Sequence, residues 1–384
     1  MMKMSKYDNV VHLLLTRFVE MFRLPEIFQE HLKVISLKGK YLLNLLQEIM
    51  MLSRFTLLML GVLIVLPLNV SAASEEIVVY SARKEHLIKP LFDLYTKKTG
   101  VAIKYITGSE GALLERLKAE GKNTPADMLI TVDAGNLWHA SQEDVLQPVS
   151  SESLDTSIPA NLRDPEGDWF GLSVRARTIV YNATKVNPTE LSSYENLAQK
   201  QWSGRLALRT SKKVYNQSLV ASLIAEHGSE EASVVVQGWV KNLAVAPFSN
   251  DTKALEAVAA GIADVTIVNT YYFGRLMKKT PALPLAIFWP NQDGAGVHMN
   301  VSGAGITKYS DNKGGAIRLL EWLAGSEAQS QFAALNMEYP ANPDIKPDAI
   351  VSSWGTFKGS PLNVAKYGEL QTDAIKLMDK AGYK

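Results

Sequence analysis

The sequence predicts an α/β protein of two lobes, each a mixed, mostly parallel sheet flanked by helices, with a ligand in the cleft between them. The chain has 384 residues, of which 47% are hydrophobic, so it can bury two cores. Short β-branched runs alternate with helix-like runs, which favours parallel strands covered by helices. The alternation begins at "EEIVVYSAR" and begins again at "GLSVRARTIVYN", which indicates a second lobe.

The first repeat predicts three strands and two helices in alternation. "EEIVVYSAR" is a strand, and "LIKPLFDLYTKKTG" has helical spacing and ends at Gly100. "VAIKYIT" is the next strand, and "SEGALLERLKAEG" is a helix with Ser109 as its N-cap and Gly121 at its end. "ADMLITVD" then returns as a strand.

The second repeat follows the same order. "GLSVRARTIVYN" and "GRLALRT" are strand-like, and a helix is expected around Gln217 to Glu226. The stretch "ALEAVAAGIADVTIVN" predicts a small-residue helix that leads into a strand ending at Asn269. Gly294 to Gly305 predict a turn into a strand close to the crossing between lobes. No low-complexity linker separates the lobes, so the chain is expected to cross through short extended segments.

The expected lobes are discontinuous in sequence. We assign residues 73–172 and about 300–348 to the first lobe. We assign about 173–299 and 349–384 to the second lobe.

The stretch "MLSRFTLLMLGVLIVLPLNVSAASEE" indicates export. An arginine, a short apolar run, a proline and small residues follow one another as in a secretory signal peptide, which we place at residues 51–72 with cleavage after Ala72 or Ala73. A signal peptide works at an N-terminus, so we interpret residues 1–50 as an over-long reading frame, with translation starting at Met50 or Met51. The alternative is an uncleaved membrane anchor with a leucine-rich extension.

Composition excludes several classes of function. Lysine plus arginine (40) nearly balances aspartate plus glutamate (39), and no basic stripe with interleaved aromatics is present, so nucleic acid is not an expected partner. The chain has no cysteine, which excludes disulfides, thiolate metal sites and cysteine nucleophiles. No nucleophile elbow or metalloprotease motif occurs, so we expect a binding protein and not an enzyme.

Three tyrosines stand directly after predicted strands. Tyr271 and Tyr272 follow the strand that ends at Asn269, and Tyr215 follows "GRLALRT" and opens a helix. Ligands of open α/β sheets bind beyond the carboxyl ends of the strands. A single tyrosine there is usually a half-buried structural residue. Three tyrosines at two equivalent turns instead favour a binding site.

From about Glu76 to Lys384 the chain resembles the ferric ion-binding proteins of bacterial iron ABC importers. The resemblance lies in "VVYSARKEHLIKPLFDLYTKKTG", "FGLSVRARTIVYN", "RTSKKVYNQSLVASLI" and, most specifically, "TIVNTYYFGRL". It implies a monomeric periplasmic protein of the type 2 binding-protein fold that closes on one Fe(III). It also implies delivery of the metal to an ABC permease and its ATPase in the inner membrane.

The resemblance further implies the residues of the site. Tyr215, Tyr271 and Tyr272 match the iron-binding tyrosines of the family. Carbonate or bicarbonate is implied as a synergistic anion, for which we predict Arg175 as the holder, with Arg177 and Ser211 as further candidates.

Elementary chemistry agrees with this set. Fe(III) is a hard ion that prefers anionic oxygen. Three phenolates neutralise its charge, and a guanidinium balances an additional anion through paired hydrogen bonds. A different small ligand, such as an organophosphonate or a polyamine, stays open because the fold alone does not fix the ligand.

The turn after the first strand departs from the family. Some relatives place a histidine, a tyrosine or both there as iron ligands, whereas this chain has Lys84 and Glu85 at those places and His86 one residue later. We therefore expect three tyrosine ligands, with Glu85 as the additional candidate because carboxylate suits a hard ion. His86 is expected in the first turn of a helix.

Overall fold

The computed structural model describes residues 76–384. The predicted signal peptide and the extension before it lie outside the described residues. Within residues 76–384, no helix is both long enough and apolar enough to cross a membrane.

The first lobe begins as the sequence predicts. Its first elements are β1 (Glu76–Ser81), α3 (Glu85–Thr99), β2 (Ala102–Thr107), α4 (Glu110–Glu120) and β3 (Met128–Val132). Gly100 ends α3 with a φ of 77°, a left-handed conformation that glycine adopts without strain. The Ser109 side chain accepts a hydrogen bond from the Ala112 N–H and caps α4. The predicted helix ends are thus confirmed.

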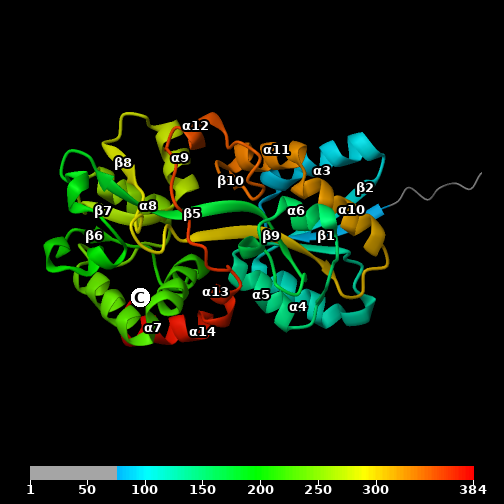
Figure 1. The fold of residues 1–384 in the computed structure, drawn as a ribbon, viewed down its shortest axis with the longest axis horizontal. Coiled ribbons are helices and arrows are strands. Elements are labelled where there is room, and N and C mark those ends of the chain that lie inside the picture. The colour runs from blue at the N-terminus through cyan, green and yellow to red at the C-terminus, as the bar shows by residue number, and fades with distance from the viewer. Residues whose placement is uncertain (1–75) are drawn as a thin grey trace, which may run out of the picture. The chain divides into compact units, whose positions relative to one another are not determined.

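Long strands join this lobe to the rest of the chain. The elements that follow are α5 (Ala134–Gln142), β4 (Leu146–Gln147), α6 (Glu152–Ser157) and the long strand β5 (Phe170–Asn182). Later in the chain come β9 (Met299–Thr307), α10 (Lys313–Ala324), α11 (Ser326–Asn336) and β10 (Tyr339–Pro340). Figure 1 shows β5 and β9 side by side in the middle of the fold.

The second lobe contains the elements that carry the three tyrosines. They are β6 (Leu206–Ala207), α7 (Val214–Lys241), α8 (Asp251–Ala259), β7 (Val265–Asn269), α9 (Thr270–Lys279) and β8 (Leu285–Phe288). The helix expected around Gln217 is confirmed, and it extends through a kink at Gly228 to Lys241. Only two residues of "GRLALRT" form regular strand, because the chain beyond Ala207 makes only an isolated bridge from Arg209 to Phe248.

The sheet is mixed. Its strand order is β2-β1-β3-β9-β5-β7-β6. The parallel pairing that the alternation predicts is present in β1–β2, β1–β3 and β6–β7. Every pairing that involves β5 or β9 is antiparallel. The strands that connect the lobes therefore run against their neighbours, while the strands inside each lobe keep the parallel order.

Strand β5 belongs to the sheets of both lobes. Its residues 170–176 pair with β9, and its residues 177–182 pair with β7 and β8. The predicted lobe boundary after residue 172 falls inside this strand, so the boundary stays a prediction.

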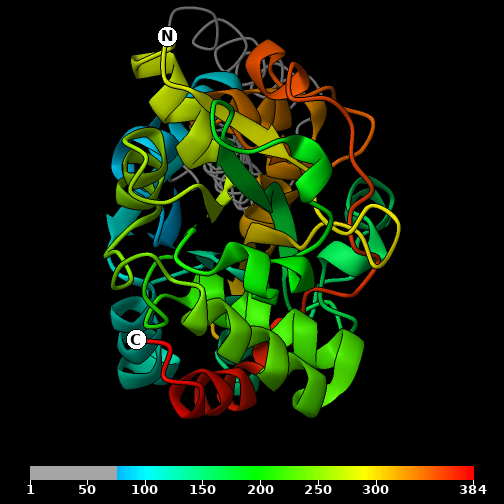
Figure 2. The same ribbon diagram turned by 90° about the vertical axis from the view of Figure 1, so that its left-hand side faces the viewer.

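The chain ends in three short helices, α12 (Ala349–Ser352), α13 (Lys366–Glu369) and α14 (Gln371–Lys380). Helix α14 packs alongside α7, and Figure 2 shows the two helices next to each other. The C-terminal residues thereby support the helix that carries Tyr215.

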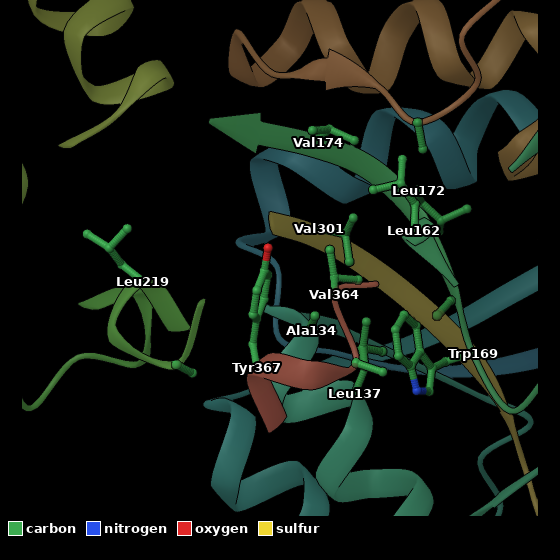
Figure 3. Close-up of a cluster of buried hydrophobic side chains, with 14 of the residues drawn as sticks. Ala134, Leu137, Leu162, Trp169, Leu172, Val174, Leu219, Val301, Val364 and Tyr367 are labelled. Atoms are coloured by element: carbon green, nitrogen blue, oxygen red, sulfur yellow. The ribbon is translucent and has the colours of Figure 1, made fainter. Parts of the chain in front are cut away.

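The core around β9 is closely packed. Figure 3 shows Val301 of β9 between Leu172 and Val174 of β5 and the side chains of Leu137 and Trp169. These side chains are all buried.

Gly303, two residues further along β9, leaves no room for a side chain. A Cβ atom there would lie 2.4 Å from the Phe170 carbonyl oxygen and 2.8 Å from a Leu137 methyl carbon. The glycine is required because the two strands and α5 approach so closely at this point.

Gly303→Ala should therefore destabilise the fold by about 1–3 kcal/mol, because the backbone of β5 must shift to admit the methyl group. Gly314→Ala in α10 is the matched control, since its Cβ would meet only Arg318 Nη1 at 3.5 Å. The control should be neutral or slightly stabilising. Denaturant unfolding measures both, and equal midpoints for the two variants would contradict the packing argument.

Candidate metal centre

The three tyrosines meet because β6 and β7 are parallel neighbours. Leu206 pairs with Val265 and Ala207 with Thr266, so both strands end at the same edge of the sheet. Tyr215 is the second residue of α7, and Tyr271 and Tyr272 are the second and third residues of α9. All three line one cavity of about 290 Å³. The structure thus brings together the three tyrosines that the sequence singles out.

The phenol groups touch one another. Tyr215 and Tyr271 are buried, and the ring centroids of Tyr271 and Tyr272 lie 4.4 Å apart. Asn269 Nδ2 donates to the Tyr271 hydroxyl oxygen at 3.3 Å. Three oxygen donors therefore face one small space.

Burial favours the protonated form of Tyr215 and Tyr271. Burial raises the pKa of Tyr215, although the positive charges of Arg175 and Lys213 oppose the shift. Burial and the neighbouring phenols Tyr215 and Tyr272 raise the pKa of Tyr271 well above its ordinary value. A metal that binds here as the phenolate complex must displace these protons.

Positive charge dominates the lining of the cavity. The carboxylates among the lining residues are Glu110 and Glu338. The lining residues with positive charge are more numerous: Arg83, Lys84, Arg175, Arg209, Lys213 and Arg275. A cavity of this composition attracts anions.

Arg175 is buried and only partly satisfied. Its Nη1 donates to Ser302 Oγ at 2.8 Å, whereas its Nε and Nη2 have no hydrogen-bond acceptor within residues 76–384. Its Nη2 lies 4.0 Å from Asp133 Oδ2, at the limit of an ion pair. Its guanidinium carbon lies 5.3 Å from the Tyr215 ring centroid. Buried donors without acceptors are costly, so an oxyanion beside the tyrosines would stabilise this side chain.

Arg177 does not line the cavity. Its Nη1 donates to Asp251 Oδ2 at 3.2 Å, and its Nη2 donates to Asn216 Oδ1 at 2.5 Å and to the Ile267 carbonyl at 3.0 Å. These partners lie on α8, α7 and β7. Arg177 therefore joins the elements that carry the tyrosines, and only its Nε lacks an acceptor within residues 76–384.

Ser211 also lies outside the cavity. Its N–H donates to the Lys384 carbonyl at 3.1 Å, and it lines a different surface hollow formed with the C-terminal residues. The structure therefore places only Arg175, of the three anion-binding candidates, beside the tyrosines.

The turn between β1 and α3 supplies cations to the cavity. Arg83 and Lys84 line it, whereas Glu85 accepts a hydrogen bond from the Tyr105 hydroxyl at 3.0 Å on the exposed surface. His86 is exposed in the first turn of α3, as expected. Glu85 thus has a partner away from the tyrosines, and it is not among the residues that line the cavity.

Two features of the site were missed at the sequence level. Arg209 is buried beside the tyrosines, with Nη1 3.5 Å from the Tyr272 hydroxyl and 3.7 Å from Asp251. Arg83 donates from both Nη atoms to Glu338 Oε2, at 3.2 and 3.1 Å. Arg209 has a local signal, since it stands at a strand end shortly before Tyr215. Glu338 lies 255 residues from Arg83, and no local pattern joins them.

The donor set fits a hard, highly charged cation. Phenolate oxygen is a ligand that Fe(III) prefers over imidazole or thioether, and no thiolate is available in a chain without cysteine. A trivalent ion at the phenol oxygens would supply the charge that favours loss of their protons. The buried guanidinium of Arg175 would then balance a bound oxyanion.

A mixed α/β sheet in two lobes, with a small polar cavity of oxygen donors and cations, defines a solute-binding protein. The sequence profile of the bacterial extracellular solute-binding protein family matches residues 123–355. The chain belongs to this family, with the ferric-binding and iron-uptake proteins as its relatives and with their type 2 binding-protein fold.

Three relatives define this similarity. The chain is 44% identical over 316 residues to iron uptake protein A1 of Synechocystis sp., covering 81% of this chain and 88% of the relative. It is 47% identical to the Trichodesmium protein IdiA (FutA) solved in complex with iron and citrate, with a TM-score of 0.78 over 80% of this chain and 100% of the relative. It is 35% identical to ferric iron-binding protein A of Mannheimia haemolytica in an open conformation, with a TM-score of 0.76 over 80% of this chain and 99% of the relative.

The two arginines of β5 should respond differently to alanine substitution. Arg177→Ala removes a buried partner of Asp251, so it should destabilise the fold by about 3–5 kcal/mol in denaturant unfolding. Arg175→Ala should cost less stability and should weaken Fe(III) binding more in bicarbonate buffer than in bicarbonate-free buffer. An equal loss of affinity in both buffers would show that Arg175 acts through the fold and not through an anion.

Proposed function

We propose that this protein captures Fe(III) through Tyr215, Tyr271 and Tyr272 and delivers it to an ABC permease and ATPase in the inner membrane. The observation that carries the proposal is the convergence of three phenols from two parallel strand ends on one cavity. The printed names of the relatives, which are iron-uptake and ferric-binding proteins, support the same cargo.

An anion accompanies the metal in this proposal. Arg175 holds a carbonate-like group through the two donors that have no acceptor within the described chain. Three phenolates cancel the charge of Fe(III), so the anion is balanced by the guanidinium and not by the metal alone. The protein acts in the periplasm as a monomer.

Protons compete with the metal at this site. Burial raises the pKa of Tyr215 and Tyr271, so each must lose a proton when Fe(III) binds. Affinity for Fe(III) therefore rises with pH below the phenol pKa values and falls as the solution is acidified. Reduction to Fe(II) also favours release, because a less charged ion attracts phenolate less strongly.

Other ligands fit the cavity less well. A polyamine requires carboxylates, whereas the lining residues are mostly cationic. An organophosphonate would use the cations but gives no role to three clustered phenols. The charge and the donor set together favour a metal with an anion.

The cargo is expected to close the lobes. The tyrosines lie on α7 and α9 of the second lobe, whereas the turn at Lys84 belongs to the first lobe. We propose that Fe(III) loads on the tyrosines and that a hinge motion then brings the first lobe onto the bound cargo.

Replacing the phenols with phenylalanine should remove iron binding and spare the fold. Tyr215→Phe, Tyr271→Phe and Tyr272→Phe each keep the ring and remove one phenolate, so each should lower Fe(III) affinity by at least about tenfold. The visible phenolate-to-Fe(III) band should shift in each single variant and vanish in the triple variant.

The matched control is Tyr309→Phe, which changes a surface tyrosine outside the cavity. It should bind Fe(III) as the parent does. A triple variant that keeps the parent's affinity and spectrum would reject the ferric assignment and leave the three tyrosines as packing residues.

A further inference from the structure

Two glutamates and a histidine meet outside the tyrosine cavity. Glu226 and His227 are consecutive residues of α7, and Glu195 begins the short 3₁₀ helix η4 (Glu195–Ala198), which packs against α7. One carboxylate oxygen of each glutamate and one ring nitrogen of the histidine all lie within 4.8 Å of one another. None of the three residues lines the tyrosine cavity. Glu226 stands three helical turns after Tyr215 on α7, about 16 Å along the helix axis.

The spacing of these donor atoms suits one metal ion. His227 Nε2 lies 2.8 Å from Glu195 Oε1 and 4.0 Å from Glu226 Oε2. Nitrogen and oxygen ligands that lie ~2.0–2.1 Å from a tetrahedral zinc ion are ~3.4 Å from one another. The two separations in this structure bracket that value, so small side-chain rotations would bring the donors to bonding distance. Three protein ligands with water in the fourth position are a common arrangement around zinc.

The two carboxylates lack a lysine or arginine partner. Across residues 76–384, the ion pairs of both Glu195 and Glu226 are made with His227 alone. Two like charges this close together repel each other, and a neutral imidazole does not offset them. A divalent cation would neutralise both carboxylates while the imidazole served as a neutral ligand.

Neighbouring side chains hold both carboxylates in place. Asn291 Nδ2 donates to both carboxylate oxygens of Glu195, at 3.2 and 3.0 Å. Ser360 Oγ lies 3.5 Å from Glu226 Oε1. The other oxygen, Glu226 Oε2, is the one nearest His227, and it accepts no hydrogen bond from the described chain. Hydrogen bonds that orient ligand carboxylates are usual around protein metal sites. His227 is exposed, so an ion can reach the site from solvent.

We propose that Glu195, Glu226 and His227 bind a divalent transition-metal ion of the zinc class. One imidazole and two carboxylates suit such an ion, whereas Fe(III) prefers anionic oxygen to imidazole. The ion takes the place of the proton between His227 Nε2 and Glu195 Oε1, which leaves to solvent, and water completes the coordination. The metal then fastens η4 to α7, the helix that carries Tyr215. This site does not depend on the proposed ferric function.

Zinc binding to the iron-free protein tests this site. Zn²⁺ affinity is measured by competition with a chromogenic zinc chelator, and the melting temperature is recorded with and without Zn²⁺. The parent should bind Zn²⁺ and melt at a higher temperature in its presence, because the ion binds the folded state. His227→Gln and Glu226→Gln should each weaken Zn²⁺ binding at least about tenfold and lose this shift, since even the hydrogen-bond partners of metal ligands contribute about 10–100-fold.

The matched controls are His86→Gln and Glu230→Gln, which remove an exposed histidine and an exposed glutamate outside both sites. Both variants should bind Zn²⁺ as the parent does. The triple phenylalanine variant of Tyr215, Tyr271 and Tyr272 should also keep this Zn²⁺ ion, because the ion lies outside the tyrosine cavity.

Far-ultraviolet circular dichroism of His227→Gln and Glu226→Gln should match that of the parent, which shows that a loss of Zn²⁺ is not a loss of fold. Their Fe(III) affinity should also be unchanged. A parent that binds no Zn²⁺, or variants that bind it as tightly as the parent, overturn this inference while the ferric function stands. Zn²⁺ binding that is lost only in the triple variant places the ion at the tyrosines and overturns it as well.

Discussion

The rest of this structure depends on the burial of phenol groups next to guanidinium groups, as in the contact between Tyr215 and Arg175. Burial keeps Tyr215 and Tyr271 protonated, and it leaves two donors of Arg175 without an acceptor within the described chain. The unpartnered donors are costly for the protein alone. An oxyanion would accept from the guanidinium, and a highly charged cation would offset the cost of removing the phenol protons. In the function proposed above, selectivity for such a cargo follows from the way the fold buries these groups.

The scaffold holds this arrangement through β5. Arg175 and Arg177 stand two residues apart on that strand, about 7 Å along it, and they take different roles. Arg175 faces the cavity, whereas Arg177 donates to Asn216 on α7 and to Asp251 on α8. The same strand pairs with β9 on one side of the crossing and with β7 on the other. The helix that carries Tyr215 is thus tied to the strand that carries Arg175, the arginine proposed to bind the anion.

Local sequence patterns predicted most helices and strands and the clustering of the three tyrosines. The features that they did not predict depend on contacts between distant parts of the chain. Helix ends at Gly100 and Ser109 follow from backbone and capping preferences, which are local. Strand direction depends on topology, so the antiparallel pairing of β5 with β9 could not be read from alternation alone. The different roles of Arg175 and Arg177 could not be predicted from the sequence for the same reason. Their hydrogen-bond acceptors come from distant parts of the chain, and the structure shows that Arg177 has more of them than Arg175. The pairing of Arg83 with Glu338 likewise joins distant parts of the chain.

Anomalous diffraction at the iron edge, from crystals of the protein loaded with Fe(III), tests the central claim most directly. The account predicts one strong peak within bonding distance of the phenol oxygens of Tyr215, Tyr271 and Tyr272, with oxyanion density between the metal and Arg175. A peak away from these tyrosines, or iron held by other side chains while the three phenols keep their mutual contacts, would contradict it.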